Sequence, residues 1–123
     1  MAENVRFELL DEDQIHDLIE SADSKNTRNV VRYAVRIFED YLKVINTDLV
    51  TTNALPNSEL DSVLQRFYAG ARQKDGTLYS KKSILSIRFG LHRHFMSSRA
   101  VDIVKHDDFS GSTRVFKSKL LLH

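Results

Sequence analysis

Apolar residues recur at helical spacing along most of the chain. The clearest example follows Pro56, where the apolar positions are separated by three or four residues: Leu60, Val63, Leu64, Phe67, Tyr68 and Ala71. This spacing places all of these side chains on one side of an α-helix. Ser58 is a suitable N-cap residue, and Asp75-Gly76 is a typical helix end because glycine tolerates the left-handed conformation there. The pattern therefore predicts a helix from Ser58 to about Asp75.

Three further long helices follow from the same kind of pattern. In residues 27–45, the apolar residues fall in one half of the helical wheel and most of the charged ones in the other. Another helix begins at Ser80, and a last one begins near Ser110 or Ser112. Residues 100–106 fit either an extension of the Ser80 helix or a crossing to the last one. The core seam of the Ser80 helix is predicted to be Ile84, Ile87, Leu91 and Phe95.

The rest of the sequence also favours helices over strands. A shorter helix is predicted over residues 11–22, where Asp11 can act as N-cap and Gln14 stands three residues on. No segment shows a useful length of strand-like alternation, and the chain has four Gly and one Pro, too few for a turn-rich β-fold. We therefore expect an all-α fold, a compact bundle of four main helices with a short N-terminal helix. Residues 1–23 are predicted to form an acidic arm, and residues 24–123 a helical domain.

The net charge of +1 conceals a strong asymmetry between these two parts. Residues 1–23 hold eight acidic residues and one arginine, a net charge of −7, whereas residues 24–123 hold 17 basic and nine acidic residues, a net charge of +8. A basic body behind an acidic arm favours a polyanionic partner such as DNA. The alternative is an ordinary solvated surface with a charged tail.

The basic residues gather on two of the predicted helices. Lys81 and Lys82 stand in the first turn of the Ser80 helix, where cations oppose the helix dipole, which suggests another use for them. Phe89 and Met96 lie on the same basic side, as a second packing face or as apolar contacts for a ligand. The residues predicted to contact DNA are Lys81, Lys82, Arg88, His92, Arg93 and Arg99 on this helix, and Lys25, Arg28, Arg32 and Arg36 on the polar side of the 27–45 helix.

Several kinds of chemistry have no residues to support them. The chain has no Cys, which excludes disulfides and thiolate zinc sites. His92 and His94 point about 200° apart on a helix and cannot chelate one metal. There is no glycine-rich phosphate loop, no Ser/His/Asp arrangement, no membrane-spanning run and no signal peptide. We expect a protein that uses no cofactor or metal and is not an enzyme.

Four segments carry a resemblance to a known family over about residues 24–120. They read SKNTRNVVRYAVRIFEDYL, FYAGARQKDGTLYSKKSIL, IRFGLHRHF and DFSGSTRVFKSKL. This pattern resembles the N-terminal SAM-like, core-binding domain of tyrosine recombinases of the Crypton type. Related segments occur in MYM-type zinc-finger and glutamine-rich QRICH-like proteins. The resemblance implies a nuclear helical domain that clamps one side of a DNA duplex. It also implies that a separate domain, absent here, supplies the catalytic Arg/His/Arg set and the nucleophilic Tyr.

Two functional hypotheses follow. The first is a non-catalytic module that binds double-stranded DNA. The second is a domesticated protein–protein interaction module in a nuclear or chromatin protein. The Leu120-Leu121-Leu122 run favours a fragment end, or a surface for a protein partner or the missing catalytic domain. The acidic arm could also fold over the basic surface as an internal DNA mimic. A helical bundle with no polyanionic partner remains a third possibility.

Overall fold

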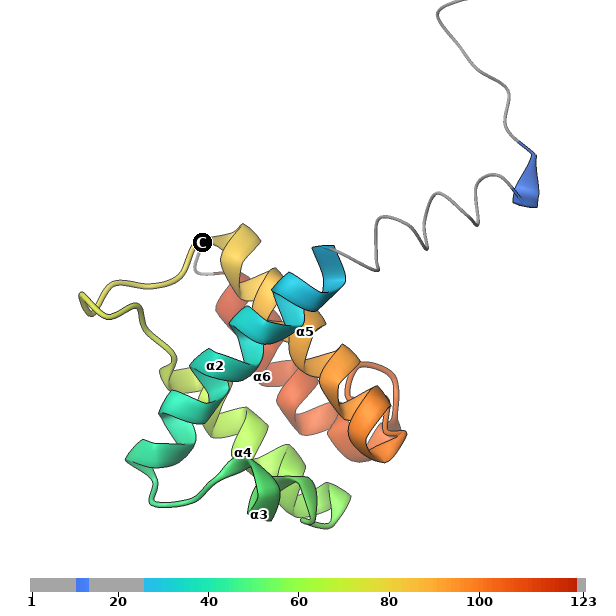
Figure 1. The fold of residues 1–123 in the computed structure, drawn as a ribbon. Helices are drawn as coiled ribbons and strands as arrows, with labels where there is room; N and C mark the ends of the chain where they lie inside the picture. The colour runs from blue at the N-terminus through green and yellow to red at the C-terminus, as the bar shows by residue number, and fades with distance from the viewer. Residues whose placement is uncertain (1–10, 14–25, 122–123) are drawn as a thin grey trace, which may run out of the picture.

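The computed structural model describes residues 11–13 and 26–121. Within residues 26–121 it contains four long α-helices and one short α-helix (Figure 1). A 3₁₀ turn, η2 (Asp107–Phe109), leads into the last helix. The all-α prediction is confirmed, and the four long helices correspond to the four that the sequence predicts. The predicted helix over 11–22 lies mostly outside the described residues, as does most of the acidic arm. The helices are α2 (Arg28–Val44), α3 (Leu49–Asn53), α4 (Asn57–Gly70), α5 (Lys81–Arg99) and α6 (Ser110–Leu120).

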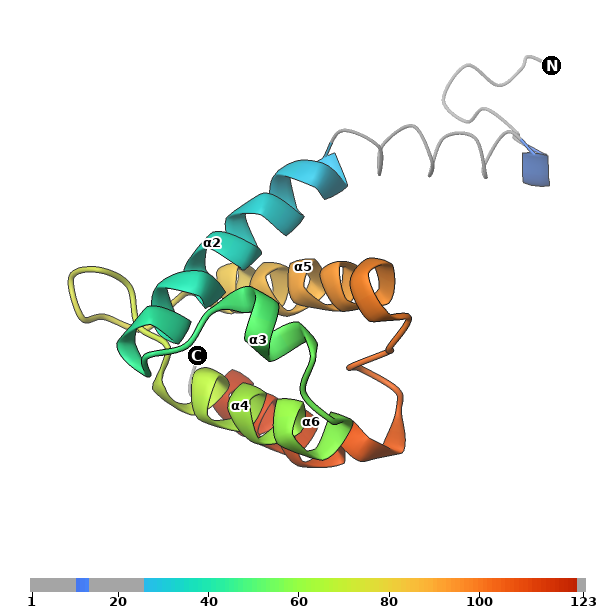
Figure 2. The same ribbon diagram turned by 60° about the horizontal axis from the view of Figure 1, so that its bottom comes forward.

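The helices form two layers. Figure 2 shows α2 and α5 in one layer and α4 and α6 side by side in the other, with α3 at the edge between them. The core lies between the layers and is rich in aromatic side chains. The ring of Phe38 in α2 meets the rings of Phe67 and Phe95 edge to face, with 5.1 Å and 6.1 Å between the ring centres. Such ring pairs add to the free energy gained by burying their apolar surface. The predicted seam of α5 is confirmed, because Ile84, Ile87, Leu91 and Phe95 are all buried.

Gly90 allows α2 and α5 to pack closely. A Cβ atom at this position would lie 2.5 Å from the Ala34 Cβ and 2.8 Å from the Val30 carbonyl oxygen. Real Cβ atoms do not approach other heavy atoms so closely, so a side chain here would push the helices apart. Gly90 therefore fixes which side of α5 faces α2.

A buried carboxylate joins α4 to α6. Asp61 accepts a hydrogen bond of 2.8 Å from the backbone N–H of Ser112 and one of 2.9 Å from Gln65 Nε2. The Ser112 N–H belongs to the first turn of α6, where backbone donors lack partners within their own helix. Asp61 thus acts as a cap supplied by another helix. The prediction that Ser58 caps α4 is wrong, because α4 begins at Asn57 and its cap residue is Pro56.

The observed ends of α4 and α5 agree with the sequence-based predictions at some positions and differ at others. Ser80 caps α5 as predicted, accepting from the Ser83 N–H at 3.1 Å. The predicted end of α4 at Asp75-Gly76 is wrong, because the helix ends at Gly70 and Gly76 turns the following loop at φ 86°. Residues 100–106 cross to α6 instead of extending α5, which ends where Ala100 adopts φ 55°.

The short helix α3 was not predicted. Its signal is Asp48, whose carboxylate accepts from the Thr51 N–H at 2.8 Å. No helix in the described part of the chain is long and apolar enough to span a membrane.

Candidate nucleic-acid interface

One groove between α2 and α5 is lined by four arginines. Arg28, Arg32 and Arg36 recur every fourth residue along α2, and Arg93 reaches the same groove from α5. Residues four apart lie on the same side of a helix, which explains the row on α2. The groove has a volume of about 590 Å³. Arg93, one of the six cations predicted on the Ser80 helix, therefore meets Arg28, Arg32 and Arg36 of the other predicted set here. The other lining residues are Thr27, Val31, Val35, Glu39, His94 and Ser97.

Three of these arginines are available to a ligand. Arg32, Arg36 and Arg93 are exposed, and no carboxylate of the described residues forms an ion pair with any of them. The first turn of α2 contains no acidic residue, and α5 contains none along its whole length. Guanidinium groups without such partners are well suited to bind phosphate in a bidentate manner. We call the groove formed by Arg28, Arg32, Arg36 and Arg93 the arginine groove.

His94 is the residue of the arginine groove that can change its charge near neutral pH. Its side chain is half-buried, and its Nε2 lies 3.4 Å from Asn53 Oδ1. Burial lowers the pKa of His94, while the negative charge of Glu39 opposes this shift. The imidazole is therefore mainly neutral at pH 7, and an anion in the groove would favour its protonation.

Lys81 and Lys82 lie across α2 from the arginine groove. Both are exposed at the N-terminal end of α5, and they line a second hollow with Val30, Leu85 and Phe89. The walls of this hollow are mostly apolar, unlike a simple phosphate site. These two lysines therefore line a different hollow from Arg93.

Arg88 points toward α6 and is part of the fold. Its guanidinium lies 4.5 Å from the centre of the Phe116 ring, and its Nη2 donates to Thr113 Oγ1 at 2.7 Å. Burial raises the pKa of Tyr68, and the neighbouring Arg88 charge opposes that rise. By stacking on the Phe116 ring and donating a hydrogen bond to Thr113, Arg88 stabilises the contact between α5 and α6.

His92 packs against the loop that follows α5. Its Nδ1 is buried, 3.5 Å from Asp102 Oδ1, and forms no hydrogen bond. Burial opposes ionisation of Asp102, but the N–H groups of Lys105 and Val104 outweigh it, so the pKa of Asp102 lies below its usual value. The carboxylate is therefore ionised near neutral pH and faces the His92 ring.

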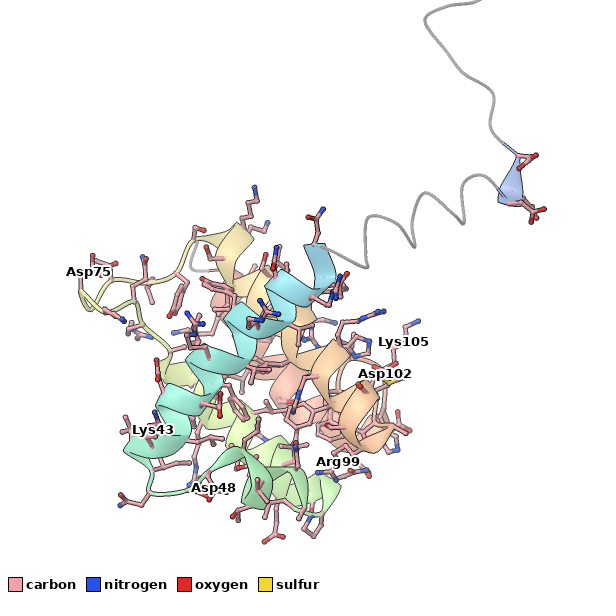
Figure 3. All side chains as sticks on the ribbon, in the orientation of Figure 1. Lys43, Asp48, Asp75, Arg99, Asp102 and Lys105 are labelled. Atoms are coloured by element: carbon pink, nitrogen blue, oxygen red, sulfur yellow. The ribbon has the colours of Figure 1, made fainter. Side chains whose placement is uncertain are left out.

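Arg99 ties the end of α5 to the other layer. It donates to the Asn53 carbonyl oxygen at 3.0 Å and to Asn57 Oδ1 at 2.9 Å. Figure 3 shows it at the same end of the molecule as Asp102 and Lys105. The predicted DNA contacts thus occupy several places in the fold, and Lys25 lies outside the described residues.

Sequence reasoning missed that Arg93 shares a groove with the α2 row, and it did not select His94 or Ser97. Ser97 stands four residues after Arg93, so the helical spacing could have indicated that they share a face. Nothing in the spacing shows which face of α5 meets α2. No group of three or more His, Asp or Glu within the described residues is arranged to hold a metal ion.

Two curated proteins are similar to this chain. The "Uncharacterized protein KIAA1958" of Homo sapiens is 31% identical over 110 residues, and the "Uncharacterized protein KIAA1958 homolog" of Mus musculus is 30% identical over 110 residues. Each match covers 88% of this chain but only 15% of the relative, so the chain spans a small part of their length. No family model matches the chain, and no solved structure matches it significantly.

Proposed function

We propose that the helical domain binds double-stranded DNA through the arginine groove and acts as a non-catalytic positioning module. The observation that carries this proposal is the convergence of Arg28, Arg32 and Arg36 of α2 with Arg93 of α5 on one open groove. Phosphate contacts of this kind supply most of the affinity and orient a protein on the duplex.

The shape of the surface suits a duplex. The exposed side of α2 presents Asn29, Arg32, Tyr33 and Arg36 to solvent over two turns. An α-helix fits the major groove of B-DNA, and cations along its sides then reach the phosphates of the flanking strands. Arg93 is placed to contact such a strand from α5, because it lines the groove beside α2.

The resemblance to a recombinase core-binding domain supports the same proposal. In that setting the module would hold DNA in the nucleus while a separate domain performed strand cleavage. The all-α architecture agrees with this interpretation. The similar human and mouse proteins have names that state no ligand.

A salt titration with a matched charge control tests the proposal. A labelled duplex is titrated with the wild-type chain and with the triple variant Arg32→Gln/Arg36→Gln/Arg93→Gln, and anisotropy is read at several salt concentrations. Each phosphate contact contributes about −0.9 to the slope of log K against log salt. The triple variant is therefore expected to reduce the size of that slope by about 2.7.

The control variant changes net charge equally but on the other layer. Arg66→Gln/Arg114→Gln/Lys117→Gln removes three exposed cations from α4 and α6. We expect this variant to retain nearly all of the slope. Equal losses in both triple variants would show a diffuse charge effect and contradict the arginine groove. Absence of wild-type binding at about 50 mM salt would contradict DNA binding altogether.

A further inference from the structure

A line of exposed apolar side chains runs along the outward side of α5. Leu85 is 44% exposed, Phe89 is 43% exposed and Met96 is 44% exposed. Their spacing of four and seven residues places them on one face, over a length of about 16 Å. The sequence left two interpretations of Phe89 and Met96 open: a second packing face inside the bundle, or apolar contacts for a ligand. Within the described residues no element buries them, so we call Leu85, Phe89 and Met96 the apolar stripe.

The apolar stripe continues into a hollow beside α2. Leu85 and Phe89 line this hollow together with Val30, Lys81 and Lys82, and its volume is about 560 Å³. Contiguous exposed apolar surface with a polar rim is typical of protein interaction sites. A side chain from a partner could fill this hollow and bury the ring face of Phe89, as interface anchors do.

The rim of the apolar stripe carries only positive charge from its own helix. Lys81 and Lys82 stand at its N-terminal end and Arg93 lies beside its middle, all of them exposed. No acidic residue occurs among the 19 residues of α5. A partner that covers the stripe must therefore place carboxylates beside these cations, or leave them buried without counter-charges at high cost.

We propose that the apolar stripe docks an acidic amphipathic helix of a protein partner. Apolar residues at positions i, i+3, i+4 and i+7 of that helix would contact Leu85, Phe89 and Met96, and flanking Asp or Glu side chains would pair with Lys81, Lys82 and Arg93. This is the helix-against-apolar-face mode of recognition. The length of the stripe, about three turns, matches the apolar side of one short helix.

Other occupants fit the surface less well. A second copy that used the same face would bring two basic helices together, which like charges disfavour. A DNA duplex supplies phosphates for the lysines but little apolar surface for the side chains of the stripe. The arginine groove, on the other side of α2, is the better phosphate surface.

Nuclear magnetic resonance titration of the full chain tests this proposal. The probe is a synthetic 20-residue helical peptide with Leu along one side and Glu on the others, and a scrambled peptide of the same composition serves as its control. Binding of the probe is expected to shift the signals of the Leu85, Phe89 and Met96 side chains, and to weaken as salt is raised. The scrambled peptide is expected to cause smaller shifts.

Paired variants locate the binding surface. Phe89→Ser/Met96→Ser is expected to weaken probe binding about tenfold or more, because two apolar contacts are lost. The control Val44→Ser/Val50→Ser changes two residues that are 78% and 81% exposed on other helices, and is expected to leave binding unchanged. All four positions are exposed, so both variants should fold, which circular dichroism checks.

The outcomes separate the possible occupants. Equal binding of the two peptides, or equal affinity of the two double variants, would overturn the proposal. A dimer in sedimentation equilibrium that Phe89→Ser/Met96→Ser abolishes would assign the stripe to a second copy and also overturn it. So would a DNA affinity that falls with Phe89→Ser/Met96→Ser as much as with the arginine triple variant, which would assign the stripe to DNA. Retained probe binding by Arg32→Gln/Arg36→Gln would support a separate protein site, even if the DNA proposal failed.

Discussion

Arg88 and Arg93 stand five residues apart on the same helix but occupy opposite kinds of environment. Arg88 stacks on Phe116 and donates to Thr113, so its charge is used inside the fold. Arg93 is exposed and lines the groove beside the α2 arginines. Five residues turn an α-helix by about 140° relative to the starting position, enough to move a side chain from one neighbour to another. A basic helix is therefore not uniformly a binding surface, since part of its charge holds the layers together.

The largest expected effect comes from removing the aromatic ring beneath Arg88. Phe116→Ala should lower the free energy of unfolding by about 3–5 kcal/mol, because a buried ring is lost and a cavity remains. Urea denaturation measures the change. A loss below about 1 kcal/mol would show that the α5–α6 contact contributes little, and would weaken the contrast between the two arginines.

A methyl group at the helix crossing should have the next largest effect. Gly90→Ala places a Cβ against Ala34 and the Val30 carbonyl oxygen, so α2 must shift away from α5. We expect a loss of about 1–3 kcal/mol in stability, and weaker DNA binding because Arg93 moves relative to the α2 row. Thermal unfolding and anisotropy check both results. Gly70→Ala is the control, because a Cβ there meets nothing within 4 Å.

Substituting Arg88 and Arg93 separately tests whether one stabilises the fold and the other binds DNA. Arg88→Gln should cost about 2 kcal/mol of stability through the lost stacking and hydrogen bond. Arg93→Gln should change stability by no more than about 0.5 kcal/mol, while reducing the size of the salt slope for DNA by about 0.9. The reverse pattern, with Arg93 stabilising and Arg88 binding, would contradict the structural assignment.

The smallest expected effect is a pH dependence from His94. Burial holds the pKa of His94 below its ordinary value, so the unfolded chain takes up this proton more readily and stability falls as the pH drops below about 6.5. A bound duplex should raise the pKa of His94. Between pH 8 and pH 6, DNA affinity should therefore rise about twofold more for the wild-type chain than for His94→Gln. Anisotropy measured on both proteins at both pH values gives the difference, and equal rises would exclude a role for His94.

The class of fold and most of the buried side of each long helix could be predicted from the spacing of apolar residues. The Ile84, Ile87, Leu91 and Phe95 seam and the Ser80 cap follow from local spacing and chemistry, and the structure confirms them. The predicted end of α4 was wrong, and the short helix α3 was not predicted. The cap residue Asp48 was a local signal for α3 that was not used. The role of Asp61 could not be predicted from local sequence, because its partner is the backbone N–H of Ser112 in α6.

Which basic residues share a surface depends on how the helices pack against one another. A helical wheel gives the angle between Arg88 and Arg93, but not which neighbour covers each angle. That assignment rests on the close packing at Gly90, which turns one side of α5 toward α2, and on Phe116, which meets Arg88 from the other layer. Periodicity is a property of one segment, whereas a groove or an uncovered stripe is set by how several segments fill space together.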